Sequence, residues 1–386
     1  MRKLLVIIAV IVLAACSGDD KKVYIMPECM PASPKTYLAK VTVTADSTLL
    51  IIDHYSPKFD ETMHAMPHDI VLVAGDKILP LIEARGYHPP YKADRPFSVR
   101  VFLKFAALPK GADVVSLYSL NEITSWLDIG NIQLHNSYLN KGSIKCHIIG
   151  KVEHPMPARG FFLLQHNHNP KIDEHRYIPV FHNAFEYTFY LPNEERFRLA
   201  SAYEYLCQGN WIINEFIACN GTIECCFAAP KKGLFSIDDY EFTAKGGSVN
   251  DEFNAIYKQA DVESGCEDIR ERGVNLLAQG VGENDSLMVA LNNEYVLALD
   301  SKKEFLMQRL QMPSVATLLM FEKELLDDIS TARFTGECDD ELFERYALLF
   351  NMYYAKKFPG HNVVKRLAKE FEEKRWNEYA PVCTVQ

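Results

Sequence analysis

Phe97-Ser98-Val99-Arg100-Val101-Phe102-Leu103-Lys104-Phe105 is the segment that decides the fold of the N-terminal half of the chain. Every second residue from Phe97 to Phe105 is apolar, whereas positions 98, 100 and 104 are polar or charged. A period of two predicts a β-strand with one face in the core. Shorter β-rich runs flank it at 38–43, 49–53, 70–73, 114–117 and 129–134. Residues 36–140 are therefore predicted to form an N-terminal β domain of the antiparallel β-sandwich type.

A second β-rich block covers residues 141–249. Its clearest local signal is a pair of apolar runs, 211–219 and 222–228, joined by Asn220-Gly221. The Asn-Gly pair favours the positive φ angles of a type I′ turn, so these two runs are predicted to form a β-hairpin. The block as a whole is predicted to be a second antiparallel, sandwich-like domain.

Apolar residues recur at helical spacing in the last third of the chain, and residues 250–376 are predicted to form about five helices. Capping signals are predicted at three helix starts: Ser248 with Asp251, Ser301 with Glu304, and Asn362. Residues 377–386 are a C-terminal tail. The predicted fold class is therefore α+β multidomain, with two antiparallel β-sandwich-like domains followed by an α-helical region.

The chain begins with the pattern of a secretory leader. Arg2 and Lys3 form a positive segment, residues 4–13 form an apolar segment, and two alanines precede Cys16. A cysteine directly after such small residues resembles the lipobox of bacterial lipoproteins. That resemblance implies that residues 1–15 are removed as a signal peptide and that a lipid on Cys16 holds the protein to a membrane. A plain secretory leader and an anchor helix that stays in place are the alternatives.

Residues 16–35 are predicted to be the acylated cysteine and its tether. Ser17, in the place where an aspartate would stand for retention, resembles the signal for sorting to the outer membrane. The acidic pair Asp19-Asp20 resembles a signal that exports some lipoproteins to the cell exterior. The predicted location is the outer membrane, and the periplasmic face and the cell surface both remain open.

Composition excludes several classes of protein. The 386 residues include 41 Lys and Arg against 51 Asp and Glu, a formal net charge of −10. Nucleic acid needs a basic binding surface, so nucleic acid is not a predicted partner. With 48% hydrophobic and 24% charged residues, the chain is predicted to be globular and not disordered.

The ten cysteines do not form a recognisable redox or metal motif. Without Cys16 nine remain, an odd number that cannot all pair, and the sequence contains no CxxC. The thiols are predicted to be mostly free core residues. Cys225 and Cys226 are adjacent in an apolar run, so their side chains are predicted to point to opposite faces of a strand.

Three weaker candidates for ligand binding remain. His166, His168 and His175, with Asp173 and Glu174 nearby, combine metal-ligating residue types in a loop that is equally explained as a solvated turn. Soft copper ligands occur together in a second cluster: Met63, His64, Met66 and His68. An aromatic strip that could stack on sugars, or simply fill the core, comprises Trp211, Phe216 and Phe227. No cofactor and no catalytic residue are predicted, because the common hydrolase, protease and nucleotide-binding motifs are missing from the sequence.

One resemblance extends over most of the chain beyond residue 35. Structural glycines, turns and apolar positions recur at 148–152, 160–164, 178–180, 185–187, 209–211, 216–217, 220–221 and 246–250. This block resembles the β-rich domain of unknown function that precedes the thioredoxin-like domain in lipoprotein thiol-disulfide oxidoreductases of the AhpC/TSA type. Residues 102–113 resemble the extra N-terminal β domain of some of those proteins, and residues 354–361 resemble their helical spacer. The resemblance implies a fold and not a catalytic site.

The thioredoxin-like domain itself has no counterpart, because the chain ends at Gln386, about where that domain would begin. We therefore expect a non-catalytic binding or scaffold module of the cell envelope, with a protein partner in the envelope left open. A truncated or partner-dependent component of a thiol-disulfide redox system is the first alternative. A metal-binding or small-ligand-binding protein is the second.

Overall fold

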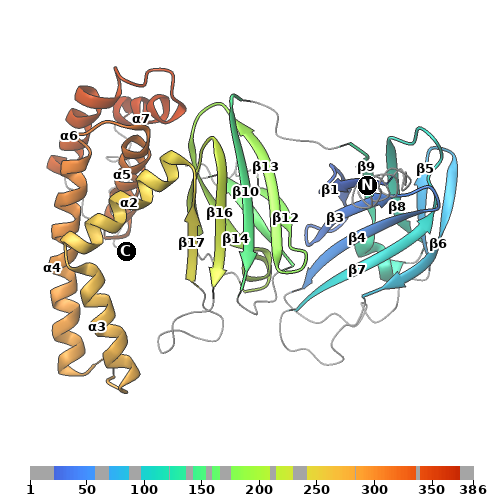
Figure 1. The fold of residues 1–386 in the computed structure, drawn as a ribbon, viewed down its shortest axis with the longest axis horizontal. Helices are drawn as coiled ribbons and strands as arrows, with labels where there is room; N and C mark the ends of the chain where they lie inside the picture. Colours follow the sequence, from blue (N-terminus) through green and yellow to red (C-terminus); the bar gives the residue numbers. More distant parts are fainter. Residues whose placement is uncertain are drawn as a thin grey trace, which may run out of the picture.

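The computed structural model describes residues 21–56, 69–86, 97–120, 122–135, 142–153, 159–165, 175–208, 214–228, 241–282, 284–335 and 340–373. An N-terminal β-rich region, a second β-rich region and a helical region follow one another along the long axis (Figure 1). This order confirms the predicted α+β class. Within the described part of the chain, no helix combines the length and the apolar character needed to cross a membrane.

The N-terminal region is one curled sheet in which every pair of neighbouring strands is antiparallel. Its strands are β1 (Lys22–Ile25), β2 (Met30–Pro31), β3 (Thr36–Val43), β4 (Ser47–Ser56), β5 (Ile70–Ala74), β6 (Lys77–Arg85), β7 (Phe97–Ala106), β8 (Val114–Ser119) and β9 (Ile129–Gln133), in the order β1-β3-β4-β7-β6-β5-β8-β9-β2. All five alternate apolar residues of β7 are buried in the core that the sheet encloses, as the period predicted. Antiparallel β structure is thus confirmed here, and the finer division into two sandwich layers stays a prediction.

The second region contains two four-stranded sheets that share one core. The strands are β10 (Ile144–Val152), β11 (Gly160–Gln165), β12 (His175–Pro179), β13 (Ala184–Leu191), β14 (Glu195–Ser201), β15 (Asn214–Ala218), β16 (Gly221–Ala228) and β17 (Glu241–Lys245). The two orders are β13-β10-β16-β17 and β12-β11-β14-β15. Phe161 of β11 stacks on Phe227 of β16, with ring centroids 4.4 Å apart, so side chains from both sheets meet in the core. One pairing departs from the antiparallel prediction, because β10 and β16 run parallel.

The predicted hairpin at Asn220-Gly221 is wrong. The strands on either side, β15 and β16, belong to different sheets, and the chain crosses from one layer to the other at this turn. Only Gly221 has a positive φ, of 119°, whereas a type I′ turn requires positive φ at both central residues. The Asn220 side chain accepts the Lys145 backbone N–H, which ties the corner to β10. Strands β15 and β16 contribute side chains to the shared core from opposite sheets and do not pair with each other.

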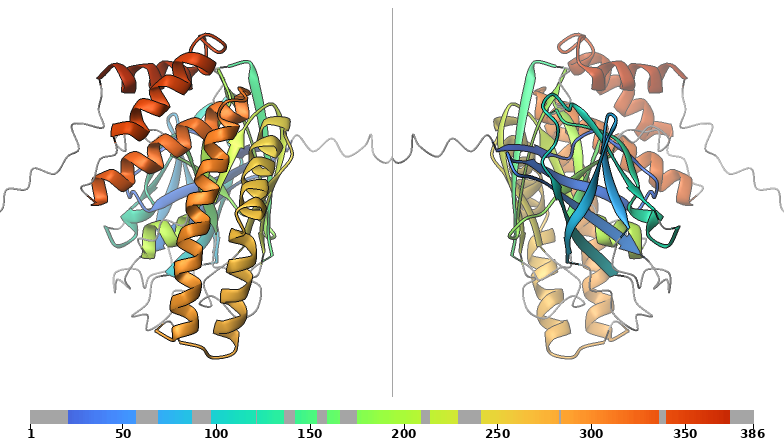
Figure 2. Two further views of the ribbon diagram at one scale, coloured as in Figure 1. Left: turned by 90° about the vertical axis from the view of Figure 1, so that its left-hand side faces the viewer. Right: turned by 90° about the vertical axis from the view of Figure 1, so that its right-hand side faces the viewer.

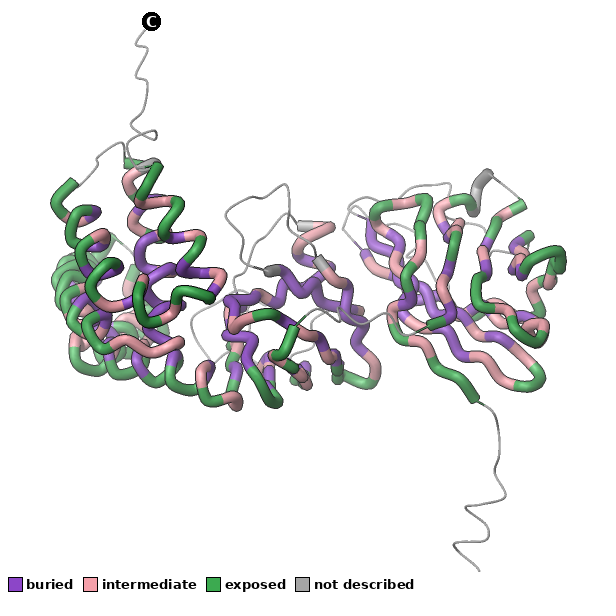
Figure 3. Tube along the Cα trace, turned by 90° about the horizontal axis from the view of Figure 1, so that it is seen from above, coloured by how far each residue is buried: buried purple, intermediate pink, exposed green. Residues whose placement is uncertain are grey.

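The helical region packs against the second β-rich region. It comprises α2 (Ser248–Glu263), α3 (Cys266–Ala278), α4 (Ser286–Arg309), α5 (Val315–Thr335), α6 (Asp340–Leu349), the π-helical turn η4 (Phe350–Tyr354) and α7 (Asn362–Glu373). Helices α3 and α4 run side by side as a hairpin, as Figure 2 shows. Buried positions follow the inner strands and the inward sides of the helices, and the outer helices are largely exposed (Figure 3). Six α-helices in the described residues replace the predicted five.

The predicted capping box at Ser301 is wrong. Ser301 lies inside α4, and its hydroxyl donates to the Leu297 carbonyl, 3.2 Å away. The helix continues through this point because no glycine or proline interrupts it. The cap is sixteen residues earlier in the chain, where the Asp285 carboxylate accepts the Leu287 N–H at 2.9 Å.

The other two capping predictions are each displaced by one residue. Gly247, with φ 74°, is the N-cap of α2, and Ser248 is the first residue of the helix. Asp251 acts from inside the helix, since its carboxylate accepts the Gly246 N–H at 2.7 Å. At α7 the capping residue is His361 and not Asn362, because His361 Nδ1 accepts the Val363 N–H at 3.2 Å.

A buried ion pair joins the two β-rich regions. Arg100 of β7 donates from Nε and Nη2 to the two carboxylate oxygens of Asp53 in β4, at 2.6 and 2.7 Å. Its remaining donors reach into the second region, from Nη1 to the Val180 carbonyl at 2.6 Å and from Nη2 to the Arg159 carbonyl at 2.9 Å. The Tyr177 hydroxyl of β12 also donates to Asp53, at 2.6 Å. The guanidinium and carboxylate groups are therefore held by both regions at once.

Aromatic rings surround this ion pair. Tyr37 of β3 stacks on Tyr177 at 4.5 Å, and the hydroxyl groups of Tyr55 and Tyr177 are 3.0 Å apart. The guanidinium of Arg100 also lies 4.4 Å from the centre of the Phe181 ring. Burial raises the pKa of Asp53, and the bonds from Arg100 and Tyr177 oppose that rise. Removing two charges from water has a large free-energy cost, so the stability of the protein depends on each partner that offsets it.

A second group of charges ties the helices to β14. Arg366 of α7 donates to both carboxylate oxygens of Glu195, at 3.0 and 2.7 Å, and to Glu322 of α5 at 2.9 Å. Ile217 of β15 is part of the apolar core of the helical region. Polar and apolar contacts thus connect all three regions.

We predict that Arg100→Ala destabilises the full chain by about 3–5 kcal/mol, because it leaves the Asp53 carboxylate buried without its charge partner. Urea denaturation followed by tyrosine and tryptophan fluorescence measures the change. The double variant Asp53→Leu/Arg100→Leu should lose much less, since no isolated charge remains. Arg85→Ala is the matched control, because Arg85 pairs with Glu83 on the exposed surface. Equal midpoints for Arg100→Ala and Arg85→Ala would contradict the prediction.

Candidate binding cleft between the two β-rich regions

Two neighbouring hollows lie where the N-terminal region meets the second region. One, of about 640 Å³, is lined by Val23 and Ile25 of β1 and by residues of β10, β12 and β13. The other, of about 720 Å³, is lined by residues 26–31 and by parts of β3, β9 and β12. Both volumes fall within the range of roughly 300–1,000 Å³ that ligand pockets occupy. Met26 and Arg176 line both hollows, so we treat the two as one cleft.

Arg176 is the cation at the centre of this cleft. It lies on β12, opposite Leu163 of β11, and is half-buried. Its guanidinium makes no hydrogen bond or ion pair with any residue that the structure describes. This contrasts with Arg100, whose three guanidinium nitrogens all donate hydrogen bonds. A half-buried guanidinium with free donors is suited to bind a carboxylate or another anion.

Met26 borders the cleft with a strained backbone. Its φ is 48°, in the left-handed region that residues other than glycine rarely adopt, and its N–H donates to the Ala39 carbonyl at 3.2 Å. This conformation turns the chain from β1 towards β2, so that residues 26–31 form one wall of the second hollow. Strain of this kind often occurs at binding sites.

The opposite wall is built on a close contact between β10 and β13. Gly150 faces Phe185 in the antiparallel register, and a Cβ at Gly150 would lie 1.9 Å from the Phe185 ring. Both residues line the first hollow. The turn between β12 and β13 places His182 and Asn183 at φ 52° and 60°, and Phe181 before it also lines the hollow. The glycine therefore makes room for the ring that shapes this wall.

The metal-binding candidates fall largely outside the described residues. His166, His168, Asp173 and Glu174 lie there, as do Met63, His64, Met66, His68 and the lipidation site Cys16. The backbone of His175 begins β12, one residue before Arg176, and its side chain is not among those described. Among the described residues, no group of three or more His, Cys, Asp or Glu side chains is placed to hold a metal ion.

The aromatic strip is core where the structure describes it. Phe216 and Phe227 are buried between the two sheets of the second region, so they are not available to stack on a sugar. Trp211 lies outside the described residues. The alternative interpretation of these rings as core residues is thus confirmed for Phe216 and Phe227.

The cysteines that are described are free thiols: Cys29, Cys146, Cys207, Cys219, Cys225, Cys226 and Cys266. Cys225 is buried and Cys226 is half-buried, as expected for neighbours on opposite faces of β16. Burial raises the pKa of Cys29, Cys146 and Cys225 to about 12. A reactive thiol needs a lowered pKa, so these three groups are suited to packing and not to thiolate chemistry.

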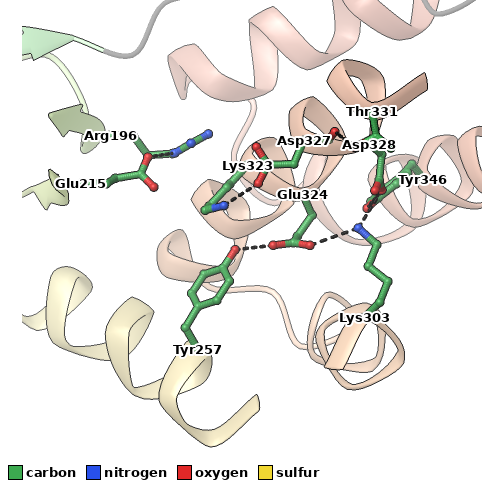
Figure 4. A network of polar contacts seen from close by, with 10 residues as sticks. All are labelled: Arg196, Glu215, Tyr257, Lys303, Lys323, Glu324, Asp327, Asp328, Thr331 and Tyr346. Carbon is green, nitrogen blue, oxygen red and sulfur yellow. Dashed lines mark hydrogen bonds and ion pairs between the residues drawn. The ribbon is translucent and has the colours of Figure 1, made fainter. Parts of the chain in front are cut away.

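The helical region contains a polar network of charged residues and tyrosines (Figure 4). Lys303 of α4 donates to Glu324 at 3.1 Å and to Asp328 at 2.7 Å, both on α5. The hydroxyl groups of Tyr257 and Tyr346 donate to the same two carboxylates. Burial, together with these carboxylates, raises the pKa of both tyrosines, so they remain neutral donors. Since both carboxylates are engaged by partners from other helices, the network braces α2, α4, α5 and α6 against one another.

Sequence reasoning did not identify the cleft. Arg176 carries a weak signal, as a charged residue in the short β-forming run that ends at Pro179. The strained Met26 has no signal in the sequence. Comparison with family models, with curated proteins and with solved structures gives no match. The resemblance to the oxidoreductase-associated domain therefore remains a prediction.

We predict that Gly150→Ala destabilises the protein by about 1–3 kcal/mol, because the new methyl group must displace the Phe185 ring or the backbone of β10. Urea denaturation gives the change in free energy. Gly130→Ala is the matched control on β9, where the nearest atom to an added Cβ is 3.8 Å away. Phe185→Leu in the Gly150→Ala background should recover part of the loss. Equal effects at Gly150 and Gly130 would show that the close contact does not constrain this wall.

Proposed function

We propose that the protein is a non-catalytic binding or scaffold module of the cell envelope, which receives its ligand in the cleft between the two β-rich regions. The observation that carries this proposal is Arg176, a half-buried guanidinium without a described partner that borders both hollows. Apolar walls with one or a few placed polar groups are typical of ligand sites. The ligand is therefore expected to combine an apolar body with an anionic group.

The buried contacts around Asp53 and Arg100 support the scaffold part of the proposal. They connect the two walls of the cleft, so the cleft does not depend on a bound ligand for its shape. Preformed sites lose less conformational entropy on binding. The curled N-terminal sheet and the paired sheets of the second region are, on this proposal, both sandwich-like modules used for recognition.

The lipid anchor on Cys16 and the outer-membrane location are also part of the proposal. Their support is the lipobox resemblance at residues 13–16 and the polar stretch that follows it. A protein of the envelope, or a ligand released near it, is then the natural occupant of the cleft. The redox alternative gains no support from Cys29, Cys146 and Cys225, because burial raises the pKa of each of these thiols.

Cys16→Ala should move the protein from the membrane fraction to the soluble fraction, because the acylated thiol is then lost. Fractionation of cells followed by immunoblotting measures the distribution. Cys29→Ala is the matched control, since it removes a thiol only thirteen residues further along the chain, and it should stay with the membrane. A Cys16→Ala protein that remains firmly membrane-bound would refute the anchor.

The cleft is tested with 4-phenylbutyrate, which has an apolar ring and a carboxylate, against its neutral analogue 4-phenylbutyramide. Calorimetric titration of the full chain should show tighter binding of the carboxylate, by roughly tenfold, the value of a hydrogen bond to a charged group. Arg176→Gln should abolish that preference. Arg85→Gln, which alters an exposed arginine on β6, should leave it unchanged. No preference in the wild-type chain, or an unchanged preference in Arg176→Gln, would overturn the proposed binding role.

A further inference from the structure

The first hollow lies beside an open sheet edge. Strand β13 ends the order β13-β10-β16-β17, and its one strand neighbour among the described residues is β10. The segment of β13 that lines the hollow runs from Ala184 to Thr188. Ala184 already exchanges two backbone hydrogen bonds with Phe181, so the open part of the edge begins after Ala184. An unpaired strand edge presents backbone N–H and C=O groups that can pair with another extended chain. The hollow therefore offers hydrogen-bonding groups at regular strand spacing along one side.

The facing side of this hollow is apolar. Val23 and Ile25 of β1 line it, and they are 36% and 38% exposed. Both sit on the same face of β1, because alternate residues of a strand share a face. Two aliphatic side chains spaced in this way match alternate residues of a chain lying along β13. Their exposure on a strand at the end of its sheet is unfavourable unless something covers them.

Arg176 marks the end of this groove that meets the second hollow, since it lines both. Glu186 also lines the groove; its carboxylate is largely exposed and lies 3.6 Å from His147 Nε2. Arg176 has no such partner within the described residues. Arg176 is the one cationic side chain among the described residues that line the groove, and it lies at one end of it.

We propose that the occupant is an extended peptide that adds a strand to the edge of β13, covers Val23 and Ile25 with alternate apolar side chains, and places an acidic group on Arg176. This proposal rests on the proposed function, because it specifies the ligand of the same cleft. Backbone pairing supplies affinity in this mode of recognition, and the alternate side chains supply selectivity. The acidic group fixes the register of the peptide, since a strand that slips by one residue exposes its apolar side chains to solvent.

The test uses a short fluorescein-labelled peptide of alternating valine and threonine residues that ends in aspartate with a free carboxylate. Fluorescence anisotropy with the full chain measures its affinity. We expect saturable binding, weakened roughly tenfold when the terminal aspartate is replaced by lysine amide and by the same factor in Arg176→Gln. Methylation of alternate backbone nitrogens of the peptide should weaken binding at least as much, because it removes donors needed for strand pairing. Arg85→Gln is the control and should bind like the wild type.

Hydrogen exchange gives a second readout that does not depend on the label. Bound peptide should slow amide exchange in residues 184–191 and leave α7 unchanged. Equal binding of the methylated peptide, or no change in exchange along β13, would overturn strand addition. If 4-phenylbutyrate still binds with its carboxylate preference while the peptide fails, the further inference is refuted and the proposed function stands. If both ligands fail to depend on Arg176, both proposals are refuted.

Discussion

A guanidinium group taken out of water needs hydrogen-bond acceptors within the protein, and the three nitrogens of Arg100 find them in groups from both β-rich regions. Asp53 comes from its own sheet, and the Val180 and Arg159 carbonyls come from the next one. Buried ion pairs add little net stability compared with apolar contacts, but losing one partner is costly. In some proteins such a pair specifies one arrangement of the parts that it joins. Here the arrangement specified is that of the two cleft walls, since Pro179 and Phe181 of the first hollow flank Val180.

Arg100 and Arg176 have opposite roles in this part of the fold. Arg100 is buried and each of its guanidinium nitrogens is hydrogen-bonded, so replacing its protein partners by a ligand would carry a large desolvation cost. Arg176 lies on the strand that carries Tyr177, whose hydroxyl donates to Asp53. The buried pair therefore positions the strand that presents the free guanidinium. A recognition group works best when neighbouring contacts, and not the ligand, hold it in place.

Local patterns in the sequence predicted correctly those features that depend on a single segment. They failed where the structure of a segment depends on its pairing with a distant part of the chain. The alternation in β7 and the opposed faces of Cys225 and Cys226 follow from the geometry of a single strand, and both are confirmed. The turn at Asn220-Gly221 has the composition of a hairpin, yet β16 pairs in parallel with β10, about 75 residues earlier. Long-range pairing of this kind overrides a local turn preference. The cleft could not be predicted for the same reason. Its walls come from β1, β10, β12 and β13, which no short stretch of sequence contains.

The position of β1 links the cleft to the proposed anchor. Lys22 begins β1, six positions after Cys16. A fully extended chain spans at most about 3.6 Å per residue, so Lys22 cannot lie more than about 22 Å from Cys16. A lipid on Cys16 would therefore hold the cleft close to the membrane surface, with the helical region at the far end of the molecule (Figure 1). A ligand that diffuses freely gains little binding strength from a cleft held at the membrane. A peptide segment of a protein that is itself held at the membrane gains a high local concentration, which compensates for the modest affinity of a single added strand.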